Sequence, residues 1–267
     1  MRLATWNING LRARLDYVGL WLAERQPDVV GLQELKLEDA QFPHTQFEAW
    51  GYRAWAHGQK SWNGVAVLRR IEGAPATEPV VSVGLPGQED MGARLLRTKF
   101  EDVDFCTVYC PNGKHVEHED FPRKLAWYED LSEFVGNASA EHEVTSKPMV
   151  LCGDFNLCPG ARDTWSEELL QGGIFHTEEE RSRFQALLDH GLQDLYRVAE
   201  PEGTQFSWWD YRAGAFHKNH GLRIDFLLGT REVARRVERA WTDRDFRKKQ
   251  DGMIASDHAP VIADLSS

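Results

Sequence analysis

The sequence predicts an α/β fold in which two β-sheets pack against each other and helices cover their outer faces. Two observations favour this class. Short apolar, strand-like runs outnumber amphipathic helical stretches, and polar side chains stand at the ends of several runs. A parallel doubly wound sheet is the competing topology. That fold commonly carries a Gly-rich strand-to-helix turn, but Gly10 and Gly31 form no G-x-G-x-x-G motif, so a dinucleotide-binding fold is disfavoured.

The N-terminal third of the chain alternates strand and helix signals. Residues 3–6 predict a strand that leads to Asn7. Apolar side chains at helical spacing predict a helix over 15–26, and Pro27 marks its end. Residues 29–34 predict a second strand that runs into a carboxylate.

The central part of the chain predicts one helix and three more strands. The helix is expected near 122–135, where apolar side chains recur three residues apart. The stretch 72–92 contains Gly and Pro residues and is expected to be a surface excursion rather than a domain boundary. The strands are expected at 64–68, 95–100 and 105–110.

The C-terminal half continues the pattern. Thr177 and Glu180 have the spacing of a capping box, which predicts a helix that ends at Gly191. No linker, repeat or low-complexity stretch interrupts the chain, so we expect residues 1–267 to form one domain. Further strands are expected at 149–153, 224–228 and 261–265.

Composition restricts the function classes. Hydrophobic residues make up 42% and charged residues 27% of the 267, which is ordinary for a globular protein. No apolar run approaches the roughly 20 residues that span a bilayer, and the N-terminus shows no secretory signal, so we expect no membrane contact and a cytoplasmic location. None of the four cysteines forms a C-x-x-C motif, which favours buried, reduced thiols: Cys106, Cys110, Cys152 and Cys158.

The formal net charge of −11 is unfavourable for a generic nucleic-acid binder, because phosphate neutralisation by cations supplies most of such binding. An acidic chain can still bind DNA if its cations gather on one face and its carboxylates surround a metal. That interpretation therefore depends on motifs.

Five oxygen-bearing side chains stand at the ends of predicted strands. A carboxylate buried there without compensation costs several kcal/mol, and a hard divalent cation such as Mg²⁺ would offset that cost. The alternative is that each acid caps its own turn or pairs with an arginine. The five residues are Asn7, Glu34, Asp154, Asn156 and Asp257.

His258 follows Asp257 directly, and Asp225 lies on a strand that we expect nearby. An aspartate that orients a histidine and favours its imidazolium form is a common acid–base device, although a single histidine is more often structural. Tyr109 ends its strand just before a turn. It either hydrogen-bonds a phosphate oxygen or simply borders the turn.

Trp208 and Trp209 are adjacent and would point to opposite sides of a strand, so that one is core and the other faces a groove. An aromatic face with Arg212 nearby suits stacking on a base or packing on a sugar. Burial of both tryptophans in the core is the alternative.

Taken together and in order, six segments resemble the exonuclease III family of apurinic/apyrimidinic endonucleases, a branch of the endonuclease/exonuclease/phosphatase superfamily. The resemblance runs along the whole chain. The segments are Thr5-Trp6-Asn7-Ile8-Asn9-Gly10-Leu11-Arg12, Leu32-Gln33-Glu34, Gly153-Asp154-Phe155-Asn156, Ser207-Trp208-Trp209-Asp210-Tyr211-Arg212, Gly221-Leu222-Arg223-Ile224-Asp225 and Ser256-Asp257-His258-Ala259-Pro260.

This resemblance implies a four-layer α/β sandwich, with two packed mixed β-sheets flanked by helices. It implies a DNA-repair hydrolase of base excision repair that depends on Mg²⁺ or Mn²⁺. Its substrate would be double-stranded DNA with abasic sites or blocked 3′ ends, cut 5′ to the abasic site to leave a 3′-hydroxyl. Phosphodiesterase action on blocked 3′ ends and 3′→5′ exonuclease activity commonly accompany this incision, and the family expectation is a monomer.

The resemblance also implies residue roles. Glu34 would bind the metal, with Asn7 and Asp257 beside it. A second group would carry the chemistry, with either Asp154 or His258 as the base: Tyr109, Asp154, Asn156, Asp225 and His258. A pocket for the flipped, baseless sugar would be formed by Trp208, Leu222 and Ile224.

The acidic chain would need a local basic rim around this site, and we expect it to consist of Arg12, Arg94, Lys114, Arg212 and Arg223. Two other functions remain open. A phosphatase acting on inositol phosphates or sphingolipids would have no use for the Trp208 segment. A regulator without catalysis should have lost one of the key residues, yet all are present.

Overall fold

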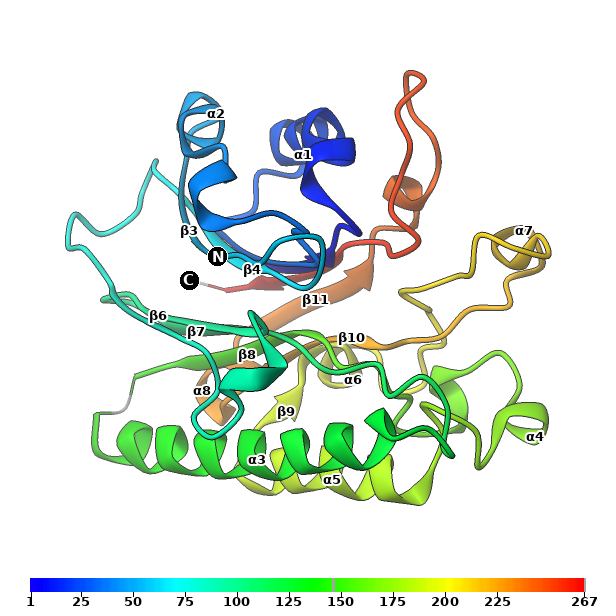
Figure 1. Ribbon diagram of the computed structural model, residues 1–267. Helices are drawn as coiled ribbons and strands as arrows, with labels where there is room; N and C mark the ends of the chain where they lie inside the picture. The colour runs from blue at the N-terminus through cyan, green and yellow to red at the C-terminus, as the bar shows by residue number, and fades with distance from the viewer. Residues whose placement is uncertain (146, 267) are drawn as a thin grey trace.

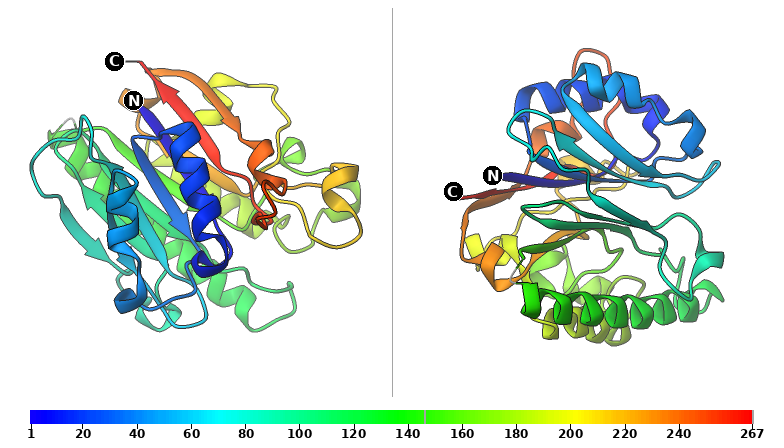
Figure 2. Two further views of the ribbon diagram at one scale, coloured as in Figure 1. Left: turned by 90° about the horizontal axis from the view of Figure 1, so that it is seen from above. Right: turned by 90° about the vertical axis from the view of Figure 1, so that its left-hand side faces the viewer.

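Two six-stranded β-sheets lie face to face in the computed structural model, which describes residues 1–145 and 147–266. Helices cover the outer face of each sheet, so the layers follow the order helix, sheet, sheet, helix (Figure 1). The side view in Figure 2 shows the same four layers. The predicted four-layer α/β sandwich is confirmed, and the doubly wound alternative is excluded because most neighbouring strands run antiparallel.

The first sheet joins the two ends of the chain. The neighbours β1 and β2 run parallel, and every other pair in this sheet is antiparallel. In spatial order its strands are β11 (Val237–Thr242), β12 (Val261–Leu265), β1 (Arg2–Asn7), β2 (Val29–Gln33), β4 (Val65–Arg70) and β3 (Tyr52–His57).

The second sheet comes from the middle of the chain. Here β7 and β8 are the parallel pair, and the other neighbours are antiparallel. In spatial order its strands are β5 (Val80–Val83), β6 (Leu95–Lys99), β7 (Asp104–Tyr109), β8 (Met149–Asp154), β10 (Asp225–Gly229) and β9 (Gln193–Asp194).

Four helices form the outer layers. The helices α1 (Leu11–Arg25) and α2 (His44–Ala49) pack on the first sheet, and α3 (Asp120–Thr145) and α5 (Glu178–Asp189) pack on the second (Figure 1). The capping box predicted at the start of α5 is present. Shorter helices connect the remaining strands: α4 (Glu167–Leu170), α6 (Leu195–Ala199), α7 (Ala215–Lys218), α8 (Arg231–Ala234) and the 3₁₀ turns Asp39–Gln41, Glu89–Met91, Ala161–Asp163 and Arg244–Arg247.

The central core fills the space between the sheets. Branched side chains of β2 and β4 meet aromatic and branched side chains of β7, β8 and β10 there. At Gly31 the sheets approach so closely that a Cβ atom would lie 2.6 Å from Thr107 Oγ1 and 2.7 Å from Cys152 Sγ. The missing side chain at Gly31 therefore permits the spacing of the sheets beneath the site.

Several element predictions need correction. The first helix begins at Leu11 rather than 15, and the long helix spans Asp120–Thr145 rather than 122–135. The expected excursion 72–92 contains the edge strand β5, whose four residues are all exposed. Three further strands were not predicted, because β3 and β11 carry charged residues and β9 has only two residues.

All four cysteines are buried and free, as predicted. Within residues 1–145 and 147–266, no helix has the length and apolar character needed to cross a membrane.

Candidate active site

The predicted site residues gather where strands of both sheets end. The parallel strands β1 and β2 finish at Asn7 and Gln33, and the parallel strands β7 and β8 finish at Tyr109 and Asp154. Asp225 begins the antiparallel strand β10 and pairs with Asp154. Strand register therefore brings side chains from distant parts of the chain to one edge.

Asn7 connects carboxylates from the two sheets. Its Nδ2 donates to Glu34 Oε1 and to Asp154 Oδ2, each at 2.9 Å. The Oδ1 of Asp154 accepts from the backbone N–H of Asn156 at 2.9 Å. Asn156 donates in turn to the Cys110 carbonyl at 2.9 Å, which ties the loop after β8 to the turn after β7.

Glu34 carries its own counter-charge. Lys36 Nζ lies 2.8 Å from Glu34 Oε2 and donates to Asn9 Oδ1 at 2.6 Å. Both Glu34 and Lys36 have a φ of 56°, a left-handed conformation that is uncommon for side-chain-bearing residues. Burial favours the neutral acid, but the ammonium group of Lys36, the Asn7 amide and the charge of His258 together outweigh it and hold the pKa of Glu34 below its usual range.

The predicted Asp225–His258 contact is present. His258 Nδ1 lies 2.9 Å from Asp225 Oδ2, and its Nε2 lies 3.8 Å from Asp154 Oδ2. Ser207 Oγ donates to the same Asp225 oxygen at 2.6 Å. The imidazole is therefore fixed between two carboxylates, one from each of the neighbouring strands β8 and β10.

Burial and neighbouring charges shift the pKa values of both His258 and Asp154. Burial disfavours the imidazolium, but Asp225 and then Asp154 outweigh it and raise the pKa of His258 to about 10. Burial also raises the pKa of Asp154 to about 7, against the opposing charge of His258. At neutral pH, His258 is a cation and Asp154 can gain or lose a proton.

The donor set fits a hard divalent cation. Ligand atoms of Glu34, Asp154 and His258 lie within 4.8 Å of one another. A protonated imidazole cannot ligate, so the carboxylate oxygens are the suitable donors, as Mg²⁺ and Mn²⁺ prefer. Asp257 does not belong to this group of three in the part of the chain that the structure describes, although we had expected it beside the metal.

Asp257 instead links the carboxylate cluster to an apolar pocket. Its Oδ1 accepts from Asn9 at 2.9 Å, and its Oδ2 accepts from Trp208 Nε1 at 3.1 Å. Burial would raise its pKa, but His258, Trp208 and Asn9 outweigh burial and lower it. Trp208 packs with the other two predicted pocket residues, Leu222 and Ile224. Three further side chains complete this cluster: Cys158, Leu170 and Phe175.

As predicted, one of the two adjacent tryptophans is buried and the other is not, but the pair does not lie in a strand. Trp209 is buried, whereas Trp208 remains partly exposed. Only isolated bridges join Trp208 to Leu222 and to His258. These two bridges place the pocket beside the catalytic histidine candidate.

Tyr109 lies close to Glu34, whose negative charge favours the protonated phenol and raises the pKa of Tyr109. Burial is the main cause that raises the pKa of Tyr109, so the phenol keeps its proton and remains a donor. Arg94 lies over the Tyr109 ring at 5.0 Å and donates to the Tyr109 carbonyl at 3.1 Å. Arg94 therefore packs against Tyr109 and is not free to form part of the expected basic rim.

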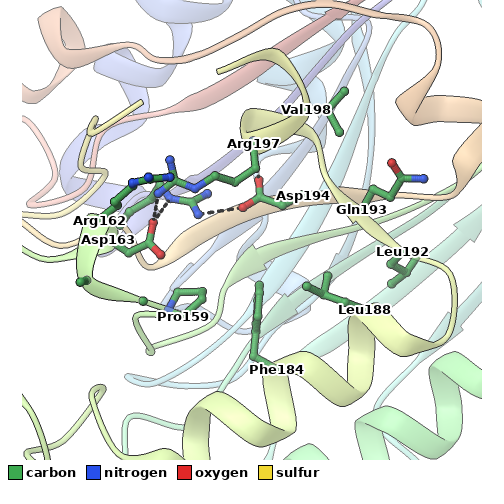
Figure 3. Close-up of a pocket in the computed structure, with 13 residues that line it drawn as sticks. Pro159, Arg162, Asp163, Phe184, Leu188, Leu192, Gln193, Asp194, Arg197 and Val198 are labelled. Carbon is green, nitrogen blue, oxygen red and sulfur yellow. Dashed lines mark hydrogen bonds and ion pairs between the residues drawn. The ribbon is translucent and has the colours of Figure 1, made fainter. Parts of the chain in front are cut away.

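The expected basic rim is wrong at Arg223. This side chain is buried and paired with Asp163 and Asp194, each at 2.7 Å. Figure 3 shows those two aspartates in a separate pocket of about 680 Å³, which contains none of the predicted catalytic or metal residues. Arg212 is exposed but bound to Asp210 at 2.7 Å, so its contact with substrate remains a prediction.

The two remaining rim residues, Arg12 and Lys114, are exposed. Lys114 pairs with Asp120 at 2.8 Å. The sequence prediction missed Lys36, although one signal was available, an opposite charge two positions after Glu34.

Comparisons with known proteins agree with this geometry. The model of the Endonuclease/Exonuclease/phosphatase family matches residues 4–258. Exodeoxyribonuclease III of Haemophilus influenzae is 36% identical, over 99% of this chain and 100% of its own length. The 3′ phosphatase NExo from Neisseria, solved with a product DNA hairpin, is similar with a TM-score of 0.91 at 36% identity over 100% of both chains. NExo is also described as a 3′-5′ exonuclease. An AP endonuclease from Archaeoglobus fulgidus gives a TM-score of 0.91 at 31% identity, also over 100% of both chains.

Proposed function

Because this chain belongs to the endonuclease/exonuclease/phosphatase family, we propose that it is a metal-dependent DNA-repair nuclease that hydrolyses phosphodiester bonds. The observation that carries the proposal is the joint placement of Glu34, Asp154 and the Asp225–His258 pair at one edge of both sheets. Relatives with full-length similarity are named as exodeoxyribonuclease III, AP endonuclease and 3′ phosphatase.

We assign the finer activity to double-stranded DNA. The enzyme incises the phosphodiester 5′ to an abasic site and leaves a 3′-hydroxyl, and it also removes blocked 3′ ends and 3′ nucleotides. We further propose that residues 1–267 act as one catalytic domain, as a monomer in the cytoplasm.

The proposed metal is Mg²⁺ or Mn²⁺, held by Glu34 with Asn7 and Asp257 nearby. When bound, such an ion stabilises negative charge on the phosphate and lowers the pKa of water. The protein supplies the remaining functions. Asp154 accepts a proton from the attacking water, an assignment supported by its buried position beside Asn7 and by its raised pKa. The backbone N–H of Asn156 fixes the orientation of that carboxylate.

His258 places a buried positive charge where the phosphate develops negative charge, and Asp225 holds it there. The Tyr109 hydroxyl donates to a phosphate oxygen. Trp208, Leu222 and Ile224 receive the baseless sugar, which leaves the helix at low cost because it has no base to unstack. Arg212 contacts the backbone near this pocket.

The deciding experiment uses a duplex with one tetrahydrofuran abasic analogue. We expect one incision 5′ to the analogue with Mg²⁺ and none with EDTA. Asp154→Ala should abolish incision, whereas Asp189→Ala, an exposed acid on α5, should behave as wild type. Intact substrate with wild-type enzyme and Mg²⁺ would exclude the endonuclease assignment, and a duplex with a 3′-phosphate then tests the 3′-end activity separately.

A further inference from the structure

A second hollow lies near the candidate active site, and its lining includes three cations, Arg247, Lys248 and Lys249. It has a volume of about 430 Å³ and lies between residues 210–217, which include the start of α7, and the loop 247–255. Both segments project on the same side of the molecule in Figure 1. We call it the basic groove; its charged and aromatic walls include Tyr211, Phe216, His217, Arg247, Lys248 and Lys249.

Arg247 is the unusual member of this groove. Only 8% of the residue is exposed, yet no carboxylate forms a salt bridge with it among residues 1–145 and 147–266. Its Nε donates to the Asp257 carbonyl at 3.0 Å and its Nη2 to the Trp209 carbonyl at 2.9 Å. A buried cation without a salt-bridge partner is costly, and the rings of Tyr211 and Phe216, at 4.9 and 5.1 Å, and the charge of Asp257 offset only part of that cost.

Two of the acids near the groove are already paired. Asp210, which lines the groove, is bound by Arg212 at 2.7 Å, and Asp245 is bound by Lys248 at 2.5 Å. Asp251, in the same loop as Lys249, is exposed but does not line the groove. Lys249 is exposed and lines the cavity. Arg247 and Lys249 therefore present positive charge to an anion, on a chain whose net charge is −11.

Arg247 links the groove to the catalytic edge. Arg247 holds the carbonyl of Asp257, whose side chain bonds Trp208 and whose neighbour is His258. The Tyr211 hydroxyl closes the other side by donating to the Ala255 carbonyl at 2.8 Å. A strand of DNA lying across His258 would reach this groove with a different part of its backbone.

We propose that the basic groove binds a phosphate group of the DNA backbone other than the scissile one, with Arg247 and Lys249 as its cations. This inference rests on the proposed function. The groove thereby fixes the direction in which the bound strand leaves the catalytic edge.

The test measures DNA binding rather than cleavage. All variants carry Asp154→Asn, which prevents turnover, and bind a fluorescent duplex with one abasic analogue in Mg²⁺ at several salt concentrations. We expect Lys249→Glu to weaken binding by roughly three- to tenfold and to lower the slope of log K against log salt by about one, as loss of one phosphate contact does. Lys249 has no packing role, so folding is not at risk.

Arg235→Glu is the matched control, because it makes the same charge change at an exposed residue after α8, at the far end of β10 from Asp225. It should change affinity less than twofold. Arg247→Gln, checked by thermal melting, should reproduce the loss of slope. Equal affinity and slope in Lys249→Glu and its parent would contradict the proposed role of the groove but not the proposed nuclease function.

Two further experiments distinguish binding of a DNA phosphate from binding of free phosphate, and failure of the groove proposal from failure of the proposed function. Shortening the duplex one nucleotide at a time from each end should abolish the Lys249→Glu effect at one length, which identifies the bound phosphate. A Lys249→Glu effect that is seen only with inorganic phosphate as the ligand, and not with duplex, contradicts the proposal. If the parent protein binds no abasic duplex at all, both the function and the groove are wrong.

Discussion

At the scale of single residues, His258 owes its charge to two carboxylates. Asp225 contacts Nδ1 at 2.9 Å and Asp154 approaches Nε2 at 3.8 Å. The Asp225 oxygen also accepts from Ser207, so its position does not depend on His258 alone. The imidazolium is thus both oriented and stabilised before any substrate arrives.

Asp225→Asn should therefore lower kcat by about 10²- to 10⁴-fold, the range typical of a misoriented acid–base group, with a smaller change in KM. The amide keeps the shape but not the charge that stabilises the imidazolium. Steady-state kinetics on the abasic duplex measure the effect. Unchanged kcat would show that His258 needs no carboxylate partner.

His176 gives a prediction on stability and pH. Burial lowers its pKa, its Nδ1 lies 3.0 Å from the Ile174 carbonyl, and its Nε2 is buried without a partner. Below pH 6.5 the unfolded chain takes up a proton that the folded chain refuses, so stability is full above that pH and is lost as the pH falls through it.

Thermal melting at pH 7.5 and 5.5 tests this. The decrease in Tm on acidification should be smaller in His176→Gln than in wild type. His115→Gln, at an exposed histidine, should show the wild-type decrease. Identical decreases in all three proteins would contradict the assignment.

The positions of Asn7, Asp154 and Asp225 could be predicted from the sequence, because each stands at one end of a strand and the strand register then fixes where it lies. The prediction failed for Arg223, whose charge suggested the surface, because its partners Asp163 and Asp194 come from distant segments.

At the scale of elements, the close approach of β2 to β7 and β8 depends on Gly31. Gly31→Ala should destabilise the fold by about 1–3 kcal/mol, since the added carbon overfills a packed interface. Chemical denaturation measures the loss. Gly160→Ala, where the nearest atom would be 3.8 Å away, should cost much less.

The buried strands were predictable as elements and the edge strands were not. Apolar runs such as β2 and β8 are buried along their whole length. By contrast, β3 and β5 are mostly exposed or half-exposed, so no continuous apolar signal marks them, and their pairing partners alone define them as strands.

At the scale of the whole molecule, the carboxylate cluster joins the two sheets. Glu34 follows β2 of the first sheet, and Asp154 ends β8 of the second. A metal held by Glu34, with Asn7 and Asp257 nearby, would bind only the folded state and would stabilise it by about 2.7 kcal/mol at a hundred times its Kd.

Melting with increasing Mg²⁺ should therefore raise the Tm of wild type. Glu34→Gln should remove most of this increase. Glu129→Gln, at an exposed pair with Arg183 on the outer layer, should retain it. A Tm that is insensitive to Mg²⁺ in all three proteins would argue against the metal site.

The antiparallel register of β12 on β1 limits where residues can be inserted into this chain. His258 stands three positions before Val261, which pairs with Thr5. Inserting one residue between them would displace the imidazole by about 3.3 Å, beyond hydrogen-bond reach of Asp225. Insertions in the exposed stretch near β5 leave that spacing untouched. In homologous sequences, insertions and deletions should therefore be found around residues 72–92 and be absent between residues 258 and 261.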